Sequence, residues 1–222
     1  MISSPLKTRR AFLETAGLAA GALALPIAAL PSAALAQAVG SAPIADLMAE
    51  GALPDVWEGS KDAPITIIEY ASMTCSHCAH FHEATYPTLK SKYIDTGKVR
   101  FVQREFPLNP LDLAGYMLAR CAGDKRAAMI GLLFAQQKNW AFSDKPLQGL
   151  TALVRQTGMS QEKFDACLQD KALHANILQV GEKASKQFRV DSTPTFFING
   201  KKVSGAMSPA ELDSQLEPLL KG

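Results

Sequence analysis

The chain has no net charge outside its N-terminal 36 residues. Its 222 residues include 23 Lys and Arg and 21 Asp and Glu. Residues 1–36 hold three of the basic residues (Lys7, Arg9 and Arg10) and one of the acidic residues (Glu14), which leaves 20 of each sign in residues 37–222. A balanced surface does not attract polyanions, so neither nucleic acid nor an anionic membrane surface is an expected target.

The chain also has no internal repeat, and no low-complexity segment beyond the N-terminal one. It has few cysteines, four in all, and none of them lies near the small residues at positions 34–38. A lipid anchor on a mature N-terminus is therefore not expected.

Residues 1–36 have the composition of an export signal. Thr8-Arg9-Arg10-Ala11-Phe12-Leu13 resembles a twin-arginine motif, although Glu14 stands where a basic residue is usual. An uncharged stretch rich in Ala and Leu follows from Thr15, and Ala34-Leu35-Ala36 is a small-residue cleavage site.

An uncleaved membrane anchor is the alternative interpretation of the same segment. The stretch is long enough, but it is rich in Ala and is interrupted by Pro26 and Pro31. We expect a periplasmic protein, with cleavage at Ala36 or Ala38 left open. Cysteines in that compartment meet an oxidising environment, where disulfides persist.

The most informative motif is Cys75-Ser76-His77-Cys78. It follows residues 65–70, a β-branched apolar run that predicts a strand buried on both faces. It precedes a segment with helical periodicity. Two cysteines with this spacing at the start of a helix can close a small redox-active disulfide, and the helix N-terminus favours the thiolate of the first.

A second motif, Thr193-Pro194-Thr195, begins 115 positions beyond Cys78 and directly precedes Phe196-Phe197-Ile198, which predicts another strand. Asn199-Gly200 before Val203 predicts a hairpin. Strand, CxxC, helix and a later Thr-Pro before a strand together resemble the thioredoxin superfamily. The long intervening stretch has room for a helical insertion, so the resemblance is closest to DsbA-type thiol–disulfide oxidoreductases.

The resemblance implies an α/β thioredoxin fold, a mixed central sheet flanked by helices, with an inserted all-helical subdomain. Other strands are predicted at residues 53–57, at a sheet edge, and at residues 99–106. The expected division of the chain is an export signal (1–36), a loose N-terminal lead-in (37–52), a first thioredoxin-like part (53–107), a helical insertion (108–188) and a second thioredoxin-like part (189–222). Insertion helices are predicted at 111–121, 126–136, 146–156, 161–169 and 172–188.

The resemblance also implies roles for individual residues. Cys75 would be the nucleophile, and Cys78 the shielded thiol that closes the disulfide or resolves a mixed disulfide. His77 would stabilise the Cys75 thiolate. Thr193 and Pro194 would form a cis-proline loop that offers backbone groups to an extended substrate peptide. For Cys75 and Cys78, the alternatives are a structural disulfide or half of a zinc site. For Pro194, the alternative is an ordinary proline at the entry to a strand.

Glu69 interrupts the apolar strand six residues before Cys75. DsbA-like proteins often carry an acid in this place, and a buried acid under the CxxC helix could exchange a proton with Cys78. A half-exposed, solvated acid is the alternative.

Cys121 and Cys167 remain, 46 residues apart, in different predicted helices. In an oxidising compartment they predict a structural disulfide. Two free buried thiols, or a regulatory redox pair, are the alternatives.

The histidines His77, His80 and His82 lie close in sequence to Cys75 and Cys78, a donor set that copper or zinc could use. Side chains two apart on a helix point in different directions, so His80 and His82 cannot both face the cysteines. We predict that both are solvated surface residues, and we expect no metal site.

These features predict a periplasmic oxidoreductase that introduces disulfides into exported proteins by exchange at Cys75 and Cys78, without a bound cofactor and as a monomer. Its partners would be reduced or partly unfolded exported proteins and a regenerating redox partner, for which a membrane protein is a candidate. A disulfide isomerase or reductase with the same site is the second hypothesis, although superfamily isomerases typically dimerise through an N-terminal domain for which residues 37–52 are too short. A copper- or zinc-binding thioredoxin-like module is the third.

Overall fold

A computed structural model of the protein describes residues 40–221, so the predicted export signal lies outside the described residues. Within this part of the chain, no helix is long and apolar enough to cross a bilayer.

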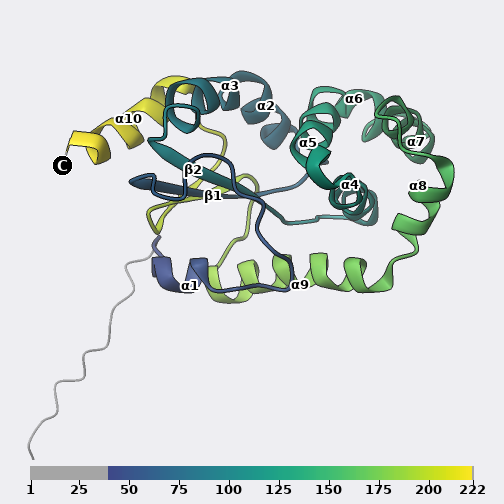
Figure 1. Cartoon of the computed structure of the whole chain (residues 1–222), viewed down its shortest axis with the longest axis horizontal. Helices are drawn as coiled ribbons and strands as arrows, with labels where there is room; N and C mark the ends of the chain where they lie inside the picture. The colour runs from purple at the N-terminus through teal and green to yellow at the C-terminus, as the bar shows by residue number, and fades with distance from the viewer. Residues whose placement is uncertain (1–39, 222) are drawn as a thin grey trace, which may run out of the picture. The chain divides into compact units, whose positions relative to one another are not determined.

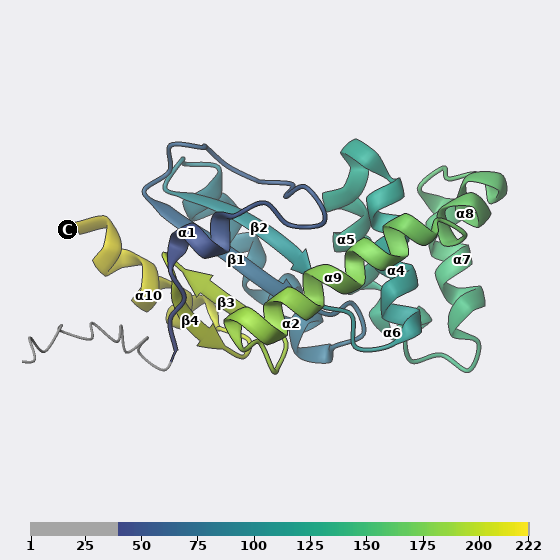
Figure 2. The ribbon, with the colours of Figure 1, turned by 90° about the horizontal axis from the view of Figure 1, so that it is seen from below.

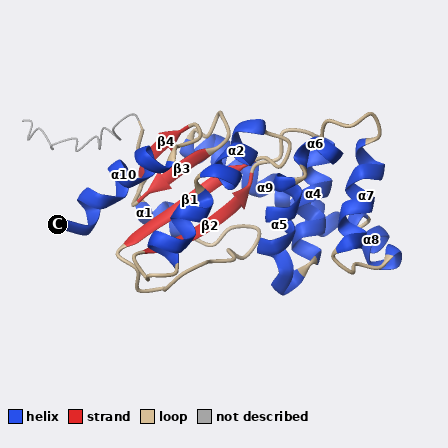
Figure 3. Ribbon diagram, turned by 90° about the horizontal axis from the view of Figure 1, so that it is seen from above, coloured by secondary structure: helices blue, strands red, loops and turns tan. Residues whose placement is uncertain are grey.

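The structure contains a mixed four-stranded sheet with the strand order β2-β1-β3-β4 (Figure 3). The strands are β1 (Ile65–Ala71), β2 (Val99–Glu105), β3 (Thr195–Ile198) and β4 (Lys201–Ser204). β1 runs parallel to β2 and antiparallel to β3, and β3 runs antiparallel to β4. Every residue of β1 is buried, as its continuous apolar run predicts for a strand covered on both faces.

Helices cover both faces of this sheet (Figure 1). One face packs against α2 (Ser76–Ala84), the π-helix η1 (Leu89–Ile94) and α10 (Pro209–Lys221). The other face packs against α1 (Ile44–Met48) and α9 (Lys171–Phe188), and Figure 2 shows α9 crossing the sheet. The single turn α3 (Tyr86–Thr88) joins α2 to η1. Because side chains alternate along a strand, Ile67 packs on the first face and Ile68 on the second.

The hairpin predicted at Asn199-Gly200 is confirmed by the pairing of β3 with β4. Both turn residues have positive φ, 46° and 89°, the backbone conformation of a two-residue hairpin turn of this kind. A Cβ on Gly200 would lie 2.6 Å from the carbonyl oxygen of Ala42, so the position also requires glycine for space.

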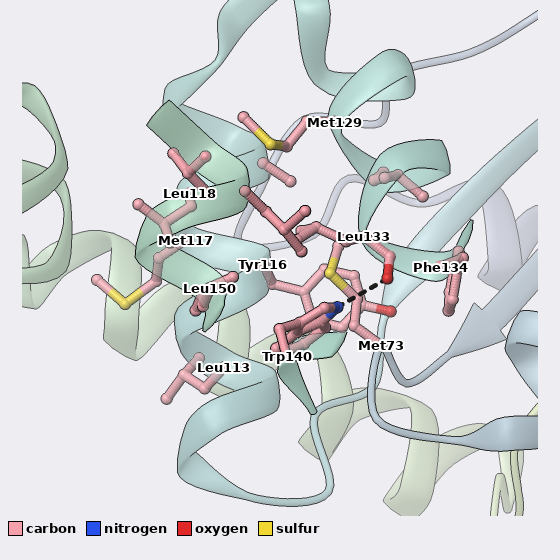
Figure 4. Close-up of a cluster of buried hydrophobic side chains, with 14 of the residues drawn as sticks. Met73, Leu113, Tyr116, Met117, Leu118, Met129, Leu133, Phe134, Trp140 and Leu150 are labelled. Atoms are coloured by element: carbon pink, nitrogen blue, oxygen red, sulfur yellow. Dashed lines mark hydrogen bonds between the residues drawn. The ribbon is translucent and has the colours of Figure 1, made fainter. Parts of the chain in front are cut away.

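The chain between β2 and α9 is helical. Its helices are α4 (Pro110–Cys121), the 3-10 turn η2 (Gly123–Lys125), α5 (Arg126–Ala135), α6 (Gln137–Trp140), α7 (Pro146–Gln156) and α8 (Gln161–Leu168). The α-helices among them share a core around the fully buried Trp140, whose Nε1 donates a hydrogen bond to the carbonyl oxygen of Leu133 at 2.8 Å (Figure 4). The same core includes Met73 and Cys78, so it reaches the CxxC motif.

Two sequence predictions on local structure are wrong. Residues 53–57 form no strand, and only Glu58, just beyond them, bridges to Phe101 of β2. Pro54 has no N–H to donate to a sheet, and Asp55 is turned toward Arg104 at 2.7 and 2.9 Å. The lead-in at 37–52 is not simply loose, because it contains α1.

A disulfide joins Cys121, the last residue of α4, to Cys167 in α8. It closes a span of 46 residues and ties together two helices that both contribute to the core around Trp140. A bond of this kind restricts the unfolded chain more than the folded one.

Replacement of both cysteines (Cys121→Ala with Cys167→Ala) should lower the free energy of unfolding by about 3–4 kcal/mol, because the unfolded chain regains the entropy that the closed loop removes. Urea unfolding followed by circular dichroism measures the change. A background with Cys75→Ala and Cys78→Ala in both proteins confines the comparison to this one bond. An unchanged midpoint, or two free thiols in the exported protein by non-reducing peptide mapping, would contradict the prediction.

Candidate redox-active site

Cys75 is the N-cap residue of α2 and follows the end of β1. The first N–H groups of a helix have no partner within it, so they are available to the sulfur of the N-cap residue. The thiol is half-buried and donates a hydrogen bond to the carbonyl oxygen of Thr193 at 3.3 Å. Cys78, one turn further along α2, is fully buried. One thiol can therefore be reached from solvent, and its partner cannot.

The two thiols differ sharply in acidity. The pKa of Cys75 is lowered to about 5, chiefly by a hydrogen bond with the Cys78 side chain and further by hydrogen bonds with Thr193 and with the backbone of Cys78 and His77, against the opposing effect of burial. The pKa of Cys78 is raised, first by burial, then by its hydrogen bond with Cys75 and by the charge of Glu69. Since the thiolate is the nucleophile, Cys75 is set to attack while Cys78 stays protonated.

The peptide bond between Thr193 and Pro194 is cis. It lies directly before β3, whose pairing with β1 extends to Thr195 opposite Tyr70. This register brings the loop before β3 beside the loop after β1, which places Thr193 against Cys75 although 118 residues separate them.

Three side chains of the helical segment hold the loop at residues 73–75. Asp112 Oδ1 accepts a hydrogen bond from the Met73 N–H at 2.7 Å. Gln137 Nε2 donates to the carbonyl oxygens of Met73 and Cys75, at 2.8 and 3.0 Å. Asn109 Nδ2 donates to Thr74 Oγ1 at 2.8 Å. No motif in the sequence points to these three residues, because the loop that they hold lies 35 to 64 positions away along the chain.

Asp112 is one of these three and is itself fully buried. Burial is the main cause that raises its pKa to about 6, while hydrogen bonds from Ser72 and from the backbone of Leu108 and Met73 oppose the rise. The charge of Cys75 raises the pKa of Asp112 as well, so the acid and the thiolate interact.

Glu69 is fully buried in β1, and its Oε2 lies 2.9 Å from Nε2 of His82. The His82 side chain is only 7 % exposed and is stacked between Phe134 and Tyr86, at 4.3 and 5.1 Å between ring centroids. The prediction that His82 is a solvated surface residue is therefore wrong. Residues four apart share a helix face, and His82 follows Cys78 by one turn on the face of α2 that packs against the sheet.

The other two histidines of this segment, His77 and His80, are exposed. His77 contributes to the lowered pKa of Cys75 through a hydrogen bond of its backbone. Across residues 40–221, no group of three or more His, Cys, Asp or Glu side chains is arranged to hold a metal ion.

Comparison with known proteins identifies the family. The family model described as Thioredoxin matches residues 52–218. A Rickettsia bellii protein, provisionally named protein-disulfide oxidoreductase, is 37% identical over 148 residues, which are 66% of this chain and 57% of that protein. The chain thus spans little more than half the length of this relative.

Two solved structures share the fold. Wolbachia pipientis alpha-DsbA1 is 30% identical, with a TM-score of 0.72 over 76% of this chain and 92% of the other. A protein-disulfide isomerase from Novosphingobium aromaticivorans is 22% identical, with a TM-score of 0.67 over 76% and 98%. The chain belongs to the thioredoxin family, and within it to the DsbA-type oxidoreductases. The predicted thioredoxin fold with a helical insertion is confirmed.

The acidity of the two thiols is directly testable in the reduced protein. Iodoacetamide should alkylate Cys75 with a rate that falls as the pH drops through about 5, because the reactive thiolate is lost there. Cys78 should stay unmodified in the folded protein, because it is buried and protonated. Peptide mapping by mass spectrometry after timed alkylation at several pH values measures both rates. Labelling of Cys78 before Cys75, or a midpoint near the ~8.5 of a free cysteine, would contradict the assignment.

Proposed function

We propose that this protein is a periplasmic thiol–disulfide oxidoreductase that introduces disulfides into exported proteins. The lowered pKa of Cys75, beside a buried partner thiol, carries the proposal. A thiolate that is stable near neutral pH stabilises the reduced form of the site and is a good leaving group. The disulfide between Cys75 and Cys78 is then a ready donor.

In the proposed reaction, a substrate thiolate attacks Sγ of Cys75 in the oxidised protein. The bond between Cys75 and Cys78 breaks, and Cys78 leaves with the electron pair. A second substrate thiolate then attacks the substrate sulfur of the mixed disulfide, which forms the substrate disulfide and releases Cys75 as a thiolate. Two electrons pass from the substrate to the protein, and no bound cofactor takes part.

Residues around the thiols would assist these steps. Thr193 and Pro194 would position an extended substrate peptide against Cys75, which the proximity of the cis-proline loop supports. Glu69 would exchange a proton with Cys78, which its burial beside that residue supports. For His77 the support is limited to its backbone.

The cellular setting is part of the proposal. The twin-arginine-like segment at 1–36 supports export to the periplasm, with the parts at 37–52, 53–107, 108–188 and 189–222 remaining after cleavage. Reduced or partly unfolded exported proteins would be the substrates. A regenerating partner, for which a membrane protein is the candidate, would reoxidise Cys75 and Cys78.

Replacement of each active-site cysteine should separate their roles. Cys75→Ala should abolish the oxidation of a reduced model peptide, because the attacked sulfur is gone. Cys78→Ala, added as a mixed disulfide with a peptide through Cys75, should retain that peptide, because no neighbouring thiol can release it. Mass spectrometry of the intact protein and of the peptide measures both outcomes, with Cys121→Ala/Cys167→Ala as the matched control. If Cys75→Ala oxidised the peptide as fast as the wild-type protein does, the proposed chemistry would be ruled out.

The redox forms should differ in stability in a way that depends on pH. The pKa of Cys75 in the folded protein lies below its unfolded value. The thiolate therefore stabilises the folded, reduced protein fully above about pH 8.5, and this stabilisation is lost as the pH falls through about 5. As the pH is raised between these two values, the melting temperature of the reduced form should therefore increase relative to that of the oxidised form. At pH 7–8 the reduced form should melt at the higher temperature.

Differential scanning calorimetry of both forms of Cys121→Ala/Cys167→Ala measures this difference, since only the active site then changes redox state. The equilibrium of the same variant with glutathione provides a second measurement. An oxidised form that melts higher throughout the range would favour a reductase over an oxidase.

A further inference from the structure

Glu69 lies beneath the CxxC helix α2, close to Cys78 and His82 of that helix. Cys78 and His82 are one turn apart on the inner face of α2. Glu69 lies on the strand face below, where its Oε2 is 2.9 Å from His82 Nε2. Its charge is close enough to raise the pKa of Cys78. A buried thiol, a buried carboxyl group and an imidazole thus form one cluster under the active site.

A cavity of about 150 Å³ lies beside His82. His82 lines it, together with Phe134 and Tyr86, which stack on the imidazole. Among the residues that the structure describes, His82 both lines this cavity and hydrogen-bonds to Glu69, which itself is not part of the lining. The imidazole therefore stands between the carboxyl group and the cavity.

The cavity wall is suited to water. Gln103 and Arg126 line it, and each has a buried polar atom without a protein partner, Oε1 and Nε respectively. A buried acceptor and a buried donor without protein partners are typical of hydrated sites, and ~150 Å³ is room for several waters at about 30 Å³ each.

Titratable and charged groups from several elements contact His82 or line the same cavity. They are Glu69 on β1, Tyr86 on α3, Glu83 on α2, Arg126 on α5 and Glu58 on the segment before β1. Glu58 also accepts a hydrogen bond from the Tyr86 hydroxyl at 2.6 Å, so its carboxylate is held near the cavity.

We propose that His82 relays protons between Glu69 and this cavity while Cys78 resolves a mixed disulfide. The inference rests on the proposed exchange reaction and adds the route by which its proton leaves. Glu69 is fully buried and does not line the cavity, so a proton that it takes from Cys78 reaches water only through a neighbouring group. The imidazole can be that group, because it has one nitrogen for Glu69 and a second for water.

The step occurs during reoxidation, when Cys75 is joined to a partner sulfur. The Cys78 proton moves to Glu69, and the freed electron pair forms the bond between Sγ of Cys78 and Sγ of Cys75. The bond between Cys75 and the partner sulfur breaks, and that sulfur leaves as a thiolate. Glu69 passes its proton to Nε2 of His82, and the imidazole releases the proton on Nδ1 to the cavity. During substrate oxidation the same route runs inward and protonates the Cys78 thiolate.

The experiment compares His82→Gln with His80→Gln, its matched control on the exposed face of the same helix. Glutamine can still hydrogen-bond to Glu69, but it cannot relay a proton. Reduced protein is mixed with excess hydroxyethyl disulfide and quenched with acid. Mass spectrometry then follows the reduced, mixed-disulfide and oxidised forms, so attack by Cys75 and resolution by Cys78 are timed separately across about pH 5 to 8.

We expect His82→Gln to slow resolution about tenfold or more without slowing attack, so that the mixed disulfide accumulates, while His80→Gln matches wild type in both steps. Wild-type resolution in His82→Gln at every pH would overturn the relay. Equal slowing of attack and resolution would also overturn it, because that result indicates a structural role. A wild-type protein that never resolves the mixed disulfide would instead refute the proposed function.

Two further measurements keep the test independent of how well one variant folds. Added imidazole should speed up the resolution of the mixed disulfide by Cys78 in His82→Ala. The acceleration should exceed any that imidazole causes in the control variant His80→Ala. In wild-type protein, deuterium oxide should slow resolution more than attack. Absence of imidazole rescue or of the isotope effect would contradict the relay.

Discussion

The antiparallel pairing of β3 with β1 is the constraint on which the site depends. β1 ends just before Cys75, and β3 begins just after Pro194, so their register sets the distance between the two loops. With Thr195 opposite Tyr70, the Thr193 carbonyl meets the Cys75 thiol. A register shift of one residue would turn every β3 side chain to the other face of the sheet and would move Thr193 relative to Cys75.

The helical insertion acts on the active site as well as on the size of the fold. Asp112 and Gln137, from α4 and α6, hydrogen-bond to the backbone of the loop that carries Cys75. A helix N-terminus lowers the pKa of a nearby thiol only if the sulfur is held close to the N–H groups. The insertion thus holds the geometry that makes Cys75 acidic, and the disulfide between Cys121 and Cys167 ties α4, which carries Asp112, to α8.

Burial gives the two cysteines of one motif opposite properties. Cys75 is at the helix end, where hydrogen-bond donors stabilise its negative charge. Cys78 is inside the insertion core, where the loss of hydration disfavours the same charge. Burial would also disfavour an isolated Glu69 carboxylate, and the hydrogen bond with His82 offsets part of that cost.

The sequence by itself determined the parts of the protein that rest on local rules. The apolar run of β1, the CxxC motif at a helix start, the Asn199-Gly200 turn and the helical periodicity of residues 146–156 each predict their structure from neighbours in the chain. The four-residue helix α6 has no such signal, because a periodic pattern needs more turns than it contains.

Only the tertiary structure decided which polar groups meet. His82 looks like any surface histidine until α2 is docked on the sheet with that face inward. Gln137 and Asp112 reach the loop before α2 because the insertion folds back onto it. Hydrogen bonds between distant residues depend on packing in three dimensions, and the spacing of residues along a chain carries no record of that packing.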